Sequence, residues 1–266
     1  MNVYDYEVSY RMTAHLPDMN GMVDTTGAFE HIKEWDVVPF EVKKKNPMIS
    51  VFISNCAISN NNRLGILEHL SRMGVTAKNH GRCPLNGPGQ NAMITHDPAF
   101  EEKSWLWSRL RDNTMQPPKG AIHMARDNIY QGGSSLFYYA AENTNCEYYH
   151  TEKPWNGFNS GAVPIYLGSN LTHREFFPKH SYIHVLDFPD YDALGNHLLY
   201  LASNETAYNE YLAWRKEPLP EFLASKIASG LTSRQPERWC TLCEYLHKNW
   251  KNSSRGFKAQ KPDRCS

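Results

Sequence analysis

Short apolar runs recur along the chain, and each is followed by a segment with helical character. Met48–Ser54 is nearly continuous in apolar residues, which suits a parallel strand covered on both faces. After it, asparagines 60–62 supply capping residues for a helix that starts at Arg63 and that Gly74 ends. A second short strand is predicted at Val75–Lys78. This order of strand, helix and strand predicts an α/β fold with a Rossmann-like parallel sheet.

The same alternation returns after residue 134. We predict strands at Leu136–Ala141, Val163–Leu167 and Ile183–Leu186, and helices at Glu152–Ser160, Tyr191–Leu201 and Asn204–Arg215. Thr151 is the expected N-cap of the first of these helices, and Gly161 its end. Residues 85–133 lie between the two regular stretches and are predicted to be an insertion that leaves the sheet, with helical character at Glu101–Arg111.

Three further segments complete the expected organisation. Val3–Tyr10 alternates aromatic and polar residues and predicts a half-buried strand. The basic run Lys43–Lys45 indicates a solvated linker, so residues 1–47 are assigned to the end of a preceding domain and its linker. The Rossmann-like domain then covers residues 48–247, and residues 248–266 form a polar tail.

Charge and hydropathy exclude some partners. The 266 residues contain 28 Lys and Arg against 28 Asp and Glu, and this balance gives no support for a nucleic-acid or anionic-membrane surface. No apolar run approaches the roughly 20 residues that cross a bilayer, and the N-terminus lacks the pattern of a signal peptide. The chain alone is therefore expected to be soluble.

Cysteines and glycosylation sequons point toward a secretory compartment. The six cysteines are Cys56, Cys83, Cys146, Cys240, Cys243 and Cys265, and sequons occur at Asn170, Asn204 and Asn252. Structural disulfides are favoured. The pair Cys240 and Cys243 could also be half of a zinc site or a redox motif, but a second ligand pair with suitable spacing is missing.

The richest candidate site is the loop from Glu142 to Lys153. In an open parallel sheet, ligands bind beyond the carboxyl ends of the strands, often at a helix N-terminus. Lys153 falls in the first turn of its helix, where a cation opposes the helix dipole, and this suggests a bound anion such as a diphosphate. Arg63 begins another helix at the same edge and could bind phosphate oxygens. The spacing alone equally allows Arg63 and Lys153 to pair with local carboxylates such as Glu152.

Other residues at this edge leave simpler interpretations open. Glu142 and Asn143 could serve only as loop-capping groups. The acids of Asp187–Asp192 fit a turn that caps the next helix, and the twelve histidines form no short-spaced ligand cluster, so we expect no tightly bound metal or other cofactor. No phosphate-binding or dinucleotide-binding glycine motif is present.

These residues resemble a known family. Phe137–Asn156, Ser160–Gly168 and Tyr208–Arg215, together with Phe52–Cys56 and Arg63, resemble the donor-site signature of the α1,3/4-fucosyltransferases, glycosyltransferase family 10. The run Thr151-Glu152-Lys153 before a Gly-Ala-Val-Pro strand is the most specific part. The similarity covers about residues 48–84 and 134–245.

The resemblance implies the C-terminal half of a GT-B fold, which binds GDP-fucose as the donor substrate, and an inverting transfer of fucose to a GlcNAc hydroxyl of a glycan. By this similarity the donor would be bound by Arg63, Glu142, Asn143, Tyr149, Glu152 and Lys153. It also implies protein glycosylation in the Golgi lumen, with a membrane anchor outside this chain. The general base belongs to the N-terminal domain in this family, so no base residue is named here.

The chain departs from the family pattern in its upstream part. The anchor, the stem and most of the acceptor domain have no counterpart, and Arg11–Leu16 differs from the motif expected after the last strand of that domain. Cys240 and Cys243 resemble a pair whose partners lie in the absent domain. Two alternatives are therefore kept: a non-catalytic GDP-sugar-binding fragment or pseudoenzyme, and a thiol redox protein.

Overall fold

The computed structural model describes residues 36–57, 59–112, 123–147, 149–170 and 177–218, together with a few short pieces. These pieces are the two-residue strands β1 (Val3–Tyr4), β2 (Val8–Ser9), β3 (Leu16–Pro17) and β9 (Phe257–Lys258), and residues 243, 247 and 248. β1 pairs antiparallel with β9, and β2 pairs parallel with β3. The rest of the predicted strand Val3–Tyr10, and most of the predicted tail, lie outside the described residues.

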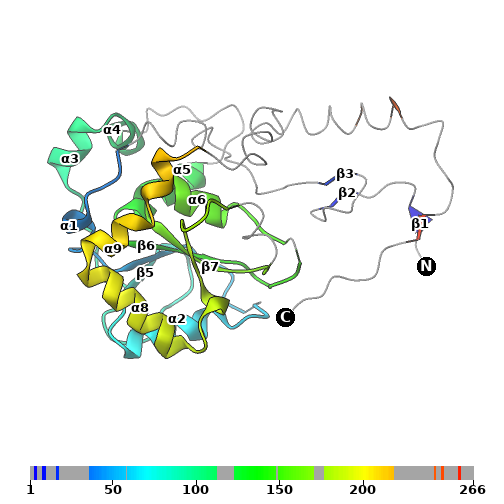
Figure 1. Cartoon of the computed structure of the whole chain (residues 1–266), viewed down its shortest axis with the longest axis horizontal. Coiled ribbons are helices and arrows are strands. Elements are labelled where there is room, and N and C mark those ends of the chain that lie inside the picture. Colours follow the sequence, from blue (N-terminus) through cyan, green and yellow to red (C-terminus); the bar gives the residue numbers. More distant parts are fainter. Residues whose placement is uncertain are drawn as a thin grey trace.

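A five-stranded parallel sheet forms the centre of the fold (Figure 1). Its strands are β4 (Ile49–Val51), β5 (Ala77–Asn79), β6 (Phe137–Ala141), β7 (Val163–Leu167) and β8 (Ile183–His184). They lie in the order β5-β4-β6-β7-β8, and every pair is parallel. Every residue of β4, β6 and β7 is buried, as expected for strands covered on both faces. The predicted Rossmann-like α/β fold is confirmed.

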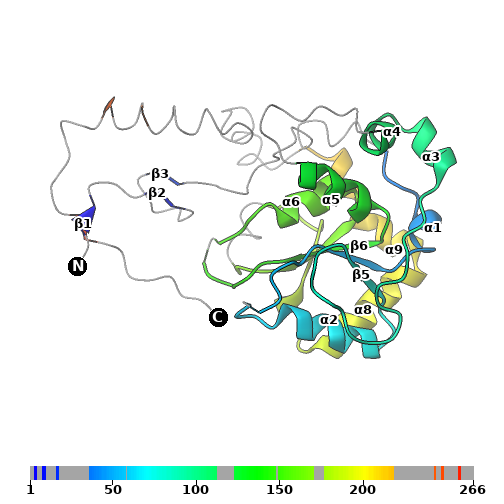
Figure 2. The same ribbon diagram turned by 180° about the vertical axis from the view of Figure 1, so that it is seen from behind.

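Helices cover both faces of the sheet (Figures 1 and 2). α2 (Arg63–Arg72) and α8 (Tyr191–Ser203) pack together on one face, and α5 (His123–Gly133) and α6 (Lys153–Ser160) pack together on the other. The shorter elements are α1 (Phe40–Lys43), α3 (Pro98–Lys103), α4 (Trp105–Arg111), α9 (Glu205–Glu210) and the 3₁₀ turns η2 (Val185–Asp187) and η3 (Ala213–Lys216). The arrangement is doubly wound.

Helix ends follow the sequence signals only in part. Gly74 and Gly161 follow α2 and α6 with φ angles of +94° and +71°, and the Asp190 carboxylate caps α8 by accepting from the Ala193 N–H at 2.7 Å. The predicted cap of α6 is wrong, whereas that of α2 is correct in position only. Asn62, at the N-cap of α2, is left-handed and makes no capping bond, while Glu152 rather than Thr151 is the N-cap residue of α6. The first residue of each helix, Arg63 or Lys153, bonds instead to residues at the sheet edge.

The predicted insertion, residues 85–133, is not wholly outside the sheet. Its last helix, α5, contacts β4 and β6 and is the crossover between β5 and β6. The predicted single helix at Glu101–Arg111 is divided at Ser104 into α3 and α4, because Ser104 is extended with ψ of 118°.

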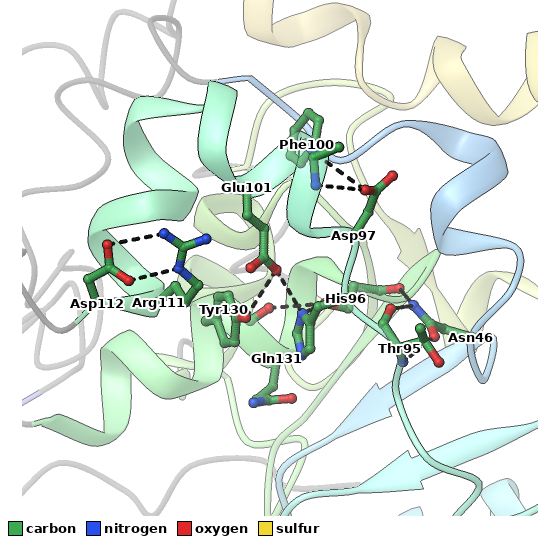
Figure 3. A network of polar contacts seen from close by, with 12 residues as sticks. Asn46, Thr95, His96, Asp97, Phe100, Glu101, Arg111, Asp112, Tyr130 and Gln131 are labelled. Carbon is green, nitrogen blue, oxygen red and sulfur yellow. Dashed lines mark hydrogen bonds and ion pairs between the residues drawn. The ribbon is translucent and has the colours of Figure 1, made fainter.

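A second small core joins this region to the linker segment, which we define as residues 36–47. Val38 packs with Trp107, Leu110 and Ile129, all buried. Figure 3 shows the polar contacts beside this core. The Asn46 side chain donates to the carbonyls of Thr95 (2.9 Å) and Ser134 (2.8 Å) and accepts from the Thr95 N–H (2.7 Å).

Glu101 is the second polar centre of that region. Its buried carboxylate accepts from the Tyr130 hydroxyl at 3.0 Å and lies 3.1 Å from Nδ1 of His96, which stacks on the Tyr130 ring (Figure 3). Among the described residues, no helix is long and apolar enough to cross a membrane.

One expectation for the linker segment is wrong. The basic run was predicted to be solvated, and Lys44 and Lys45 are exposed, but Lys43 has no exposed surface at all. Its ammonium donates to the carbonyl of Gly161 at 2.5 Å and to the Tyr208 hydroxyl at 3.2 Å.

Candidate functional site

The candidate site lies where the sheet reverses its order of strand addition. β5 lies on one side of β4 and β6 lies on the other. The chain after β4 therefore leaves the sheet edge in one direction, and the chain after β6 leaves it in the opposite direction. Open α/β sheets bind ligands in the crevice at such a point. Three hydrogen bonds join the connections: the Asn60 N–H donates to the Asn143 carbonyl at 3.0 Å, and the Asn61 amide donates to the Glu142 carbonyl at 3.0 Å and to the Asn145 side-chain oxygen at 2.9 Å.

Arg63 is the first residue of α2, and its side chain is buried, with 2% exposed. Its Nη1 donates to the Ala141 carbonyl at 3.3 Å and its Nη2 to the Asn55 carbonyl at 2.9 Å, while Nε has no partner among the described residues. Burial lowers the pKa of this guanidinium, and the nearby phenol of Tyr139 and carboxylate of Glu142 partly oppose that effect. Arg63 therefore links the end of β6 to the connection after β4, and it keeps N–H donors that no described residue uses.

Glu142 follows β6 directly and has no exposed surface. Its carboxylate accepts from the backbone N–H of Thr151 at 2.7 Å and from the Thr151 hydroxyl at 2.8 and 3.0 Å. The Lys153 ammonium donates to it at 2.9 Å and to the Thr151 hydroxyl at 2.6 Å. These bonds close the loop between Glu142 and Lys153.

Lys153 keeps its charge in this setting. Burial would lower the pKa of its ammonium, but attraction by Glu142 and Glu152 outweighs burial and raises it. The carboxylate that pairs with Lys153 is the buried Glu142, because the half-exposed Glu152 lies 4.0 Å away. The sequence also allowed Arg63 and Lys153 to pair with local carboxylates such as Glu152. Lys153 does pair with a local carboxylate, but with that of Glu142. Arg63 instead donates to backbone carbonyls.

The remaining predicted site residues surround this pair. Asn143 and Tyr149 are half-buried, and Glu152 has 48% of its side chain exposed. Burial raises the pKa of the Tyr149 phenol, and the Glu142 carboxylate raises it further. The structure thus brings Arg63, Glu142, Asn143, Tyr149, Glu152 and Lys153 to one edge of the sheet. Asn61 was missed because its contacts cross between two loops that are far apart in the sequence. Thr151 was predicted only as a helix cap, and its contacts with Glu142 and Lys153 lie within its own loop.

An aromatic stack lies at the same edge. Phe52 follows β4 and stacks on His80 (centroids 4.7 Å apart) and on the buried Tyr138 (5.2 Å). Burial, followed by repulsion from Lys78 and His96, lowers the pKa of His80 to about 4. The His80 Nε2 atom is buried and has no hydrogen-bond partner among the described residues.

A disulfide supports the connection that carries Arg63. Cys56 and Cys83 are joined across the ends of β4 and β5, with Cα atoms 5.4 Å apart, which confirms the expectation of structural disulfides. Cys146 is also disulfide-bonded, whereas Cys243 is free and exposed. Cys243 therefore forms no disulfide with Cys240, as a resting redox pair would. Within the described residues, no group of three potential ligands could hold a metal ion.

The site is a switch point of a doubly wound sheet with a basic side chain at the start of each of two neighbouring helices, which is where α/β folds bind anionic ligands. Residues 119–259 match the family model described as glycosyltransferase family 10 (fucosyltransferase), C-terminal part. The chain belongs to this family.

Individual relatives agree. Over 114 residues the chain is 41% identical to alpha-(1,3)-fucosyltransferase 4 of Bos taurus, which covers 42% of this chain and 26% of the relative. It is 28% identical over 205 residues to glycoprotein 3-alpha-L-fucosyltransferase A of Drosophila melanogaster, covering 76% of this chain and 32% of the relative. The chain thus spans about a quarter to a third of the length of these two relatives.

Solved structures show the same fold. A crystal structure of an alpha1,3-fucosyltransferase with GDP-fucose matches with a TM-score of 0.50 and 18% identity, over 82% of this chain and 51% of that one. A further crystal structure of an alpha1,3-fucosyltransferase matches with a TM-score of 0.50 and 17% identity. The sheet is that of a GT-B-type fucosyltransferase.

Proposed function

We propose that this chain carries the donor-binding half of an α1,3-fucosyltransferase and binds GDP-fucose at the edge formed by the connections after β4 and β6. The observation that carries the proposal is that two basic residues occupy equivalent positions at the sheet edge. Arg63 and Lys153 are each the first residue of a helix, and these helices follow neighbouring parallel strands. A cation at this position opposes the helix dipole, and a bound diphosphate would reverse that penalty.

Both cations retain donors for such a ligand. A lysine ammonium has three N–H donors, and Lys153 uses two of them for Glu142 and Thr151. A guanidinium has five, and Arg63 uses one on each terminal nitrogen. The existing bonds fix the direction of the remaining donors, so little reorganisation is needed when a phosphate arrives.

The proposed chemistry is a single displacement with inversion. The acceptor oxygen attacks the anomeric carbon of fucose while the bond from that carbon to the β-phosphate oxygen breaks. The proton of the acceptor hydroxyl passes to a general base, and the electron pair leaves with GDP. Arg63 and Lys153 would stabilise the negative charge that grows on the departing diphosphate. Glu152, with its exposed carboxylate, would accept from fucose hydroxyls, and Asn143 and Tyr149 would contact the donor.

We assign the base to the acceptor-binding part of the full-length protein. In this proposal residues 1–47 belong to the end of that part and its linker, residues 48–247 to the donor domain, and residues 248–266 to a tail. The acceptor is a GlcNAc-containing glycan or glycoprotein, and the compartment is the Golgi lumen, reached through a membrane anchor on the full-length product.

Calorimetric titration with GDP tests donor binding directly. Arg63→Gln and Lys153→Gln should each weaken GDP binding at least about tenfold, because a charge-assisted bond to phosphate contributes about 1.5–3 kcal/mol. Lys216→Gln, which removes an exposed cation far from the edge, is the matched control. Wild-type protein that binds neither GDP nor GDP-fucose would refute the donor site.

A further inference from the structure

The buried Lys43 has no role in the donor chemistry, yet its position is costly. Burial lowers the pKa of its ammonium well below the usual value, and repulsion from Arg215 lowers it further. Among the described residues no carboxylate pairs with it, and its contacts are the Gly161 carbonyl, the Tyr208 hydroxyl and the face of the Tyr208 ring, 5.5 Å from the centroid. Burying an amine without a carboxylate partner costs free energy, which its hydrogen bonds to Gly161 and Tyr208 offset in part.

The Gly161 carbonyl belongs to the C-terminal end of α6. The last four carbonyls of a helix have no partner within the helix, and cations near this end are favourable. A second buried cation lies at the same end, because Arg215 donates from Nη1 to the Phe158 carbonyl at 3.0 Å. Two basic side chains from distant parts of the chain thus donate hydrogen bonds to the final turn of α6.

The linker segment packs against this same end. Gly161 has φ of +71°, and a Cβ placed there would lie 3.1 Å from the nearest Val37 methyl carbon, so only a hydrogen fits between them. Phe40 packs on the Tyr208 ring with centroids 5.3 Å apart, and the Tyr208 hydroxyl donates to the Leu136 carbonyl at 2.7 Å. The linker segment is therefore fixed to α6 by apolar and polar contacts together.

The opposite end of α6 begins with Lys153, preceded by Glu152. Between the two ends the helix is buried along its whole length, from Pro154 to Ser160. Eight residues of α-helix span about 12 Å, and a buried helix of this length moves as one body. A displacement at Gly161 is therefore passed to the first turn.

We propose that Lys43 is a positioning residue for the donor site: by holding the Gly161 carbonyl it fixes α6, and with it Glu152 and Lys153, relative to the linker segment. This inference rests on the proposed donor function. It gives the linker segment a second role beyond connecting domains, since the position of α6 then depends on the conformation of residues 36–43.

Lys43→Met tests the inference, since it removes the charge and keeps most of the side-chain volume. The dissociation constant for GDP should rise at least about fivefold. The control is Leu198→Ala, a buried truncation in α8, which packs against α2 and α9 and lies on the face of the sheet opposite α6, so the change destabilises the fold from that other face. Unchanged affinity in Lys43→Met, or an equal loss in Leu198→Ala at equal thermal stability, would overturn the positioning role.

A gentler variant covers the case in which Lys43→Met does not fold. Tyr208→Phe removes the hydroxyl that accepts from Lys43 and keeps the ring, and it should weaken GDP binding in the same direction. Amide exchange of residues 153–160 should accelerate in both variants and not in Leu198→Ala. If wild-type protein fails to bind GDP, the proposed function fails, whereas the exchange data still decide whether Lys43 fixes α6.

Discussion

The Lys153 ammonium lies 2.9 Å from a carboxylate oxygen of Glu142 that has no exposed surface, and the Thr151 hydroxyl bonds to both groups. The cation is thus held in place by an anion that has itself been removed from water. Such a pair fixes its own geometry, because neither group can rotate away without leaving the other unpaired in a region of low dielectric.

Removing both partners should cost less than the sum of the costs of removing each one alone. Lys153→Met leaves the Glu142 carboxylate with only the Thr151 donors, and we expect a loss of about 3 kcal/mol of unfolding free energy. The double variant Glu142→Gln with Lys153→Met should lose less than the sum of the single changes, with a coupling energy of about 1–3 kcal/mol. Urea denaturation of the four proteins measures this cycle, and strict additivity would show that the pair is not coupled.

The disulfide between Cys56 and Cys83 should stabilise the fold and the connection that carries Arg63. It closes a loop with a sequence separation of 27, for which the chain-entropy model gives about 3.5 kcal/mol. We expect Cys56→Ser with Cys83→Ser to lower the midpoint of urea denaturation. Reducing agent should then destabilise the double variant less than the wild-type protein, since of the disulfides described only that of Cys146 is left to reduce, whereas an equal effect on both proteins would place the redox-sensitive stability at that other bond.

The sheet was predictable because strands that are buried on both faces appear in the sequence as short continuous apolar runs. Val163–Leu167 was predicted with its observed bounds, since a short apolar run between a glycine and a Gly-Ser pair has few other interpretations. The location of the candidate residues at one edge of the sheet was also predictable, whereas their role in donor binding stays a prediction. Parallel strands deliver the residues after them to one edge, so Arg63 and Lys153 meet there even though 90 positions separate them.

The hydrogen-bond partners of the polar side chains could not be predicted from the sequence. Lys43 stands in a run of three lysines that looks solvated, and only the packing of Val37 and Phe40 on the end of α6 carries its side chain inward. Thr151 has the residue type of an N-cap, but the buried carboxylate of Glu142 binds its hydroxyl and its N–H first. The first outcome depends on contacts across more than a hundred residues, and the second on how the loop between Glu142 and Lys153 closes on itself, and neither is recorded in a local pattern.

Gly161 and Gly74 offer a test of how tightly the linker segment packs. Both have positive φ, but a Cβ at Gly74 would meet open space, whereas one at Gly161 would press on Val37. Gly74→Ala should therefore cost about 1–2 kcal/mol from backbone strain alone, and Gly161→Ala should cost about 1–3 kcal/mol more. Adding Val37→Ala to Gly161→Ala should recover part of the loss, and equal costs at the two glycines would mean that the linker segment does not press on α6.

His80 should make the fold sensitive to mild acid. Its pKa falls from 6.5 to about 4 on folding, because burial and the charges of Lys78 and His96 disfavour the imidazolium. The unfolded chain therefore binds a proton between these values while the folded chain does not, and stability decreases as the pH falls through this window. Below about pH 4 both states are protonated, and the contribution of His80 no longer changes with pH.

His80→Phe isolates this effect, since it keeps a ring to stack on Phe52 and has nothing to titrate. Its buried Nε2 atom has no hydrogen-bond partner to lose among the described residues. The unfolding free energy of the wild-type protein should drop relative to that of the variant by up to about 3 kcal/mol between pH 6.5 and 4. Carboxylates and His197 titrate in both proteins and cancel in the difference. Parallel acid profiles for the two proteins would show that folding does not lower the pKa of His80.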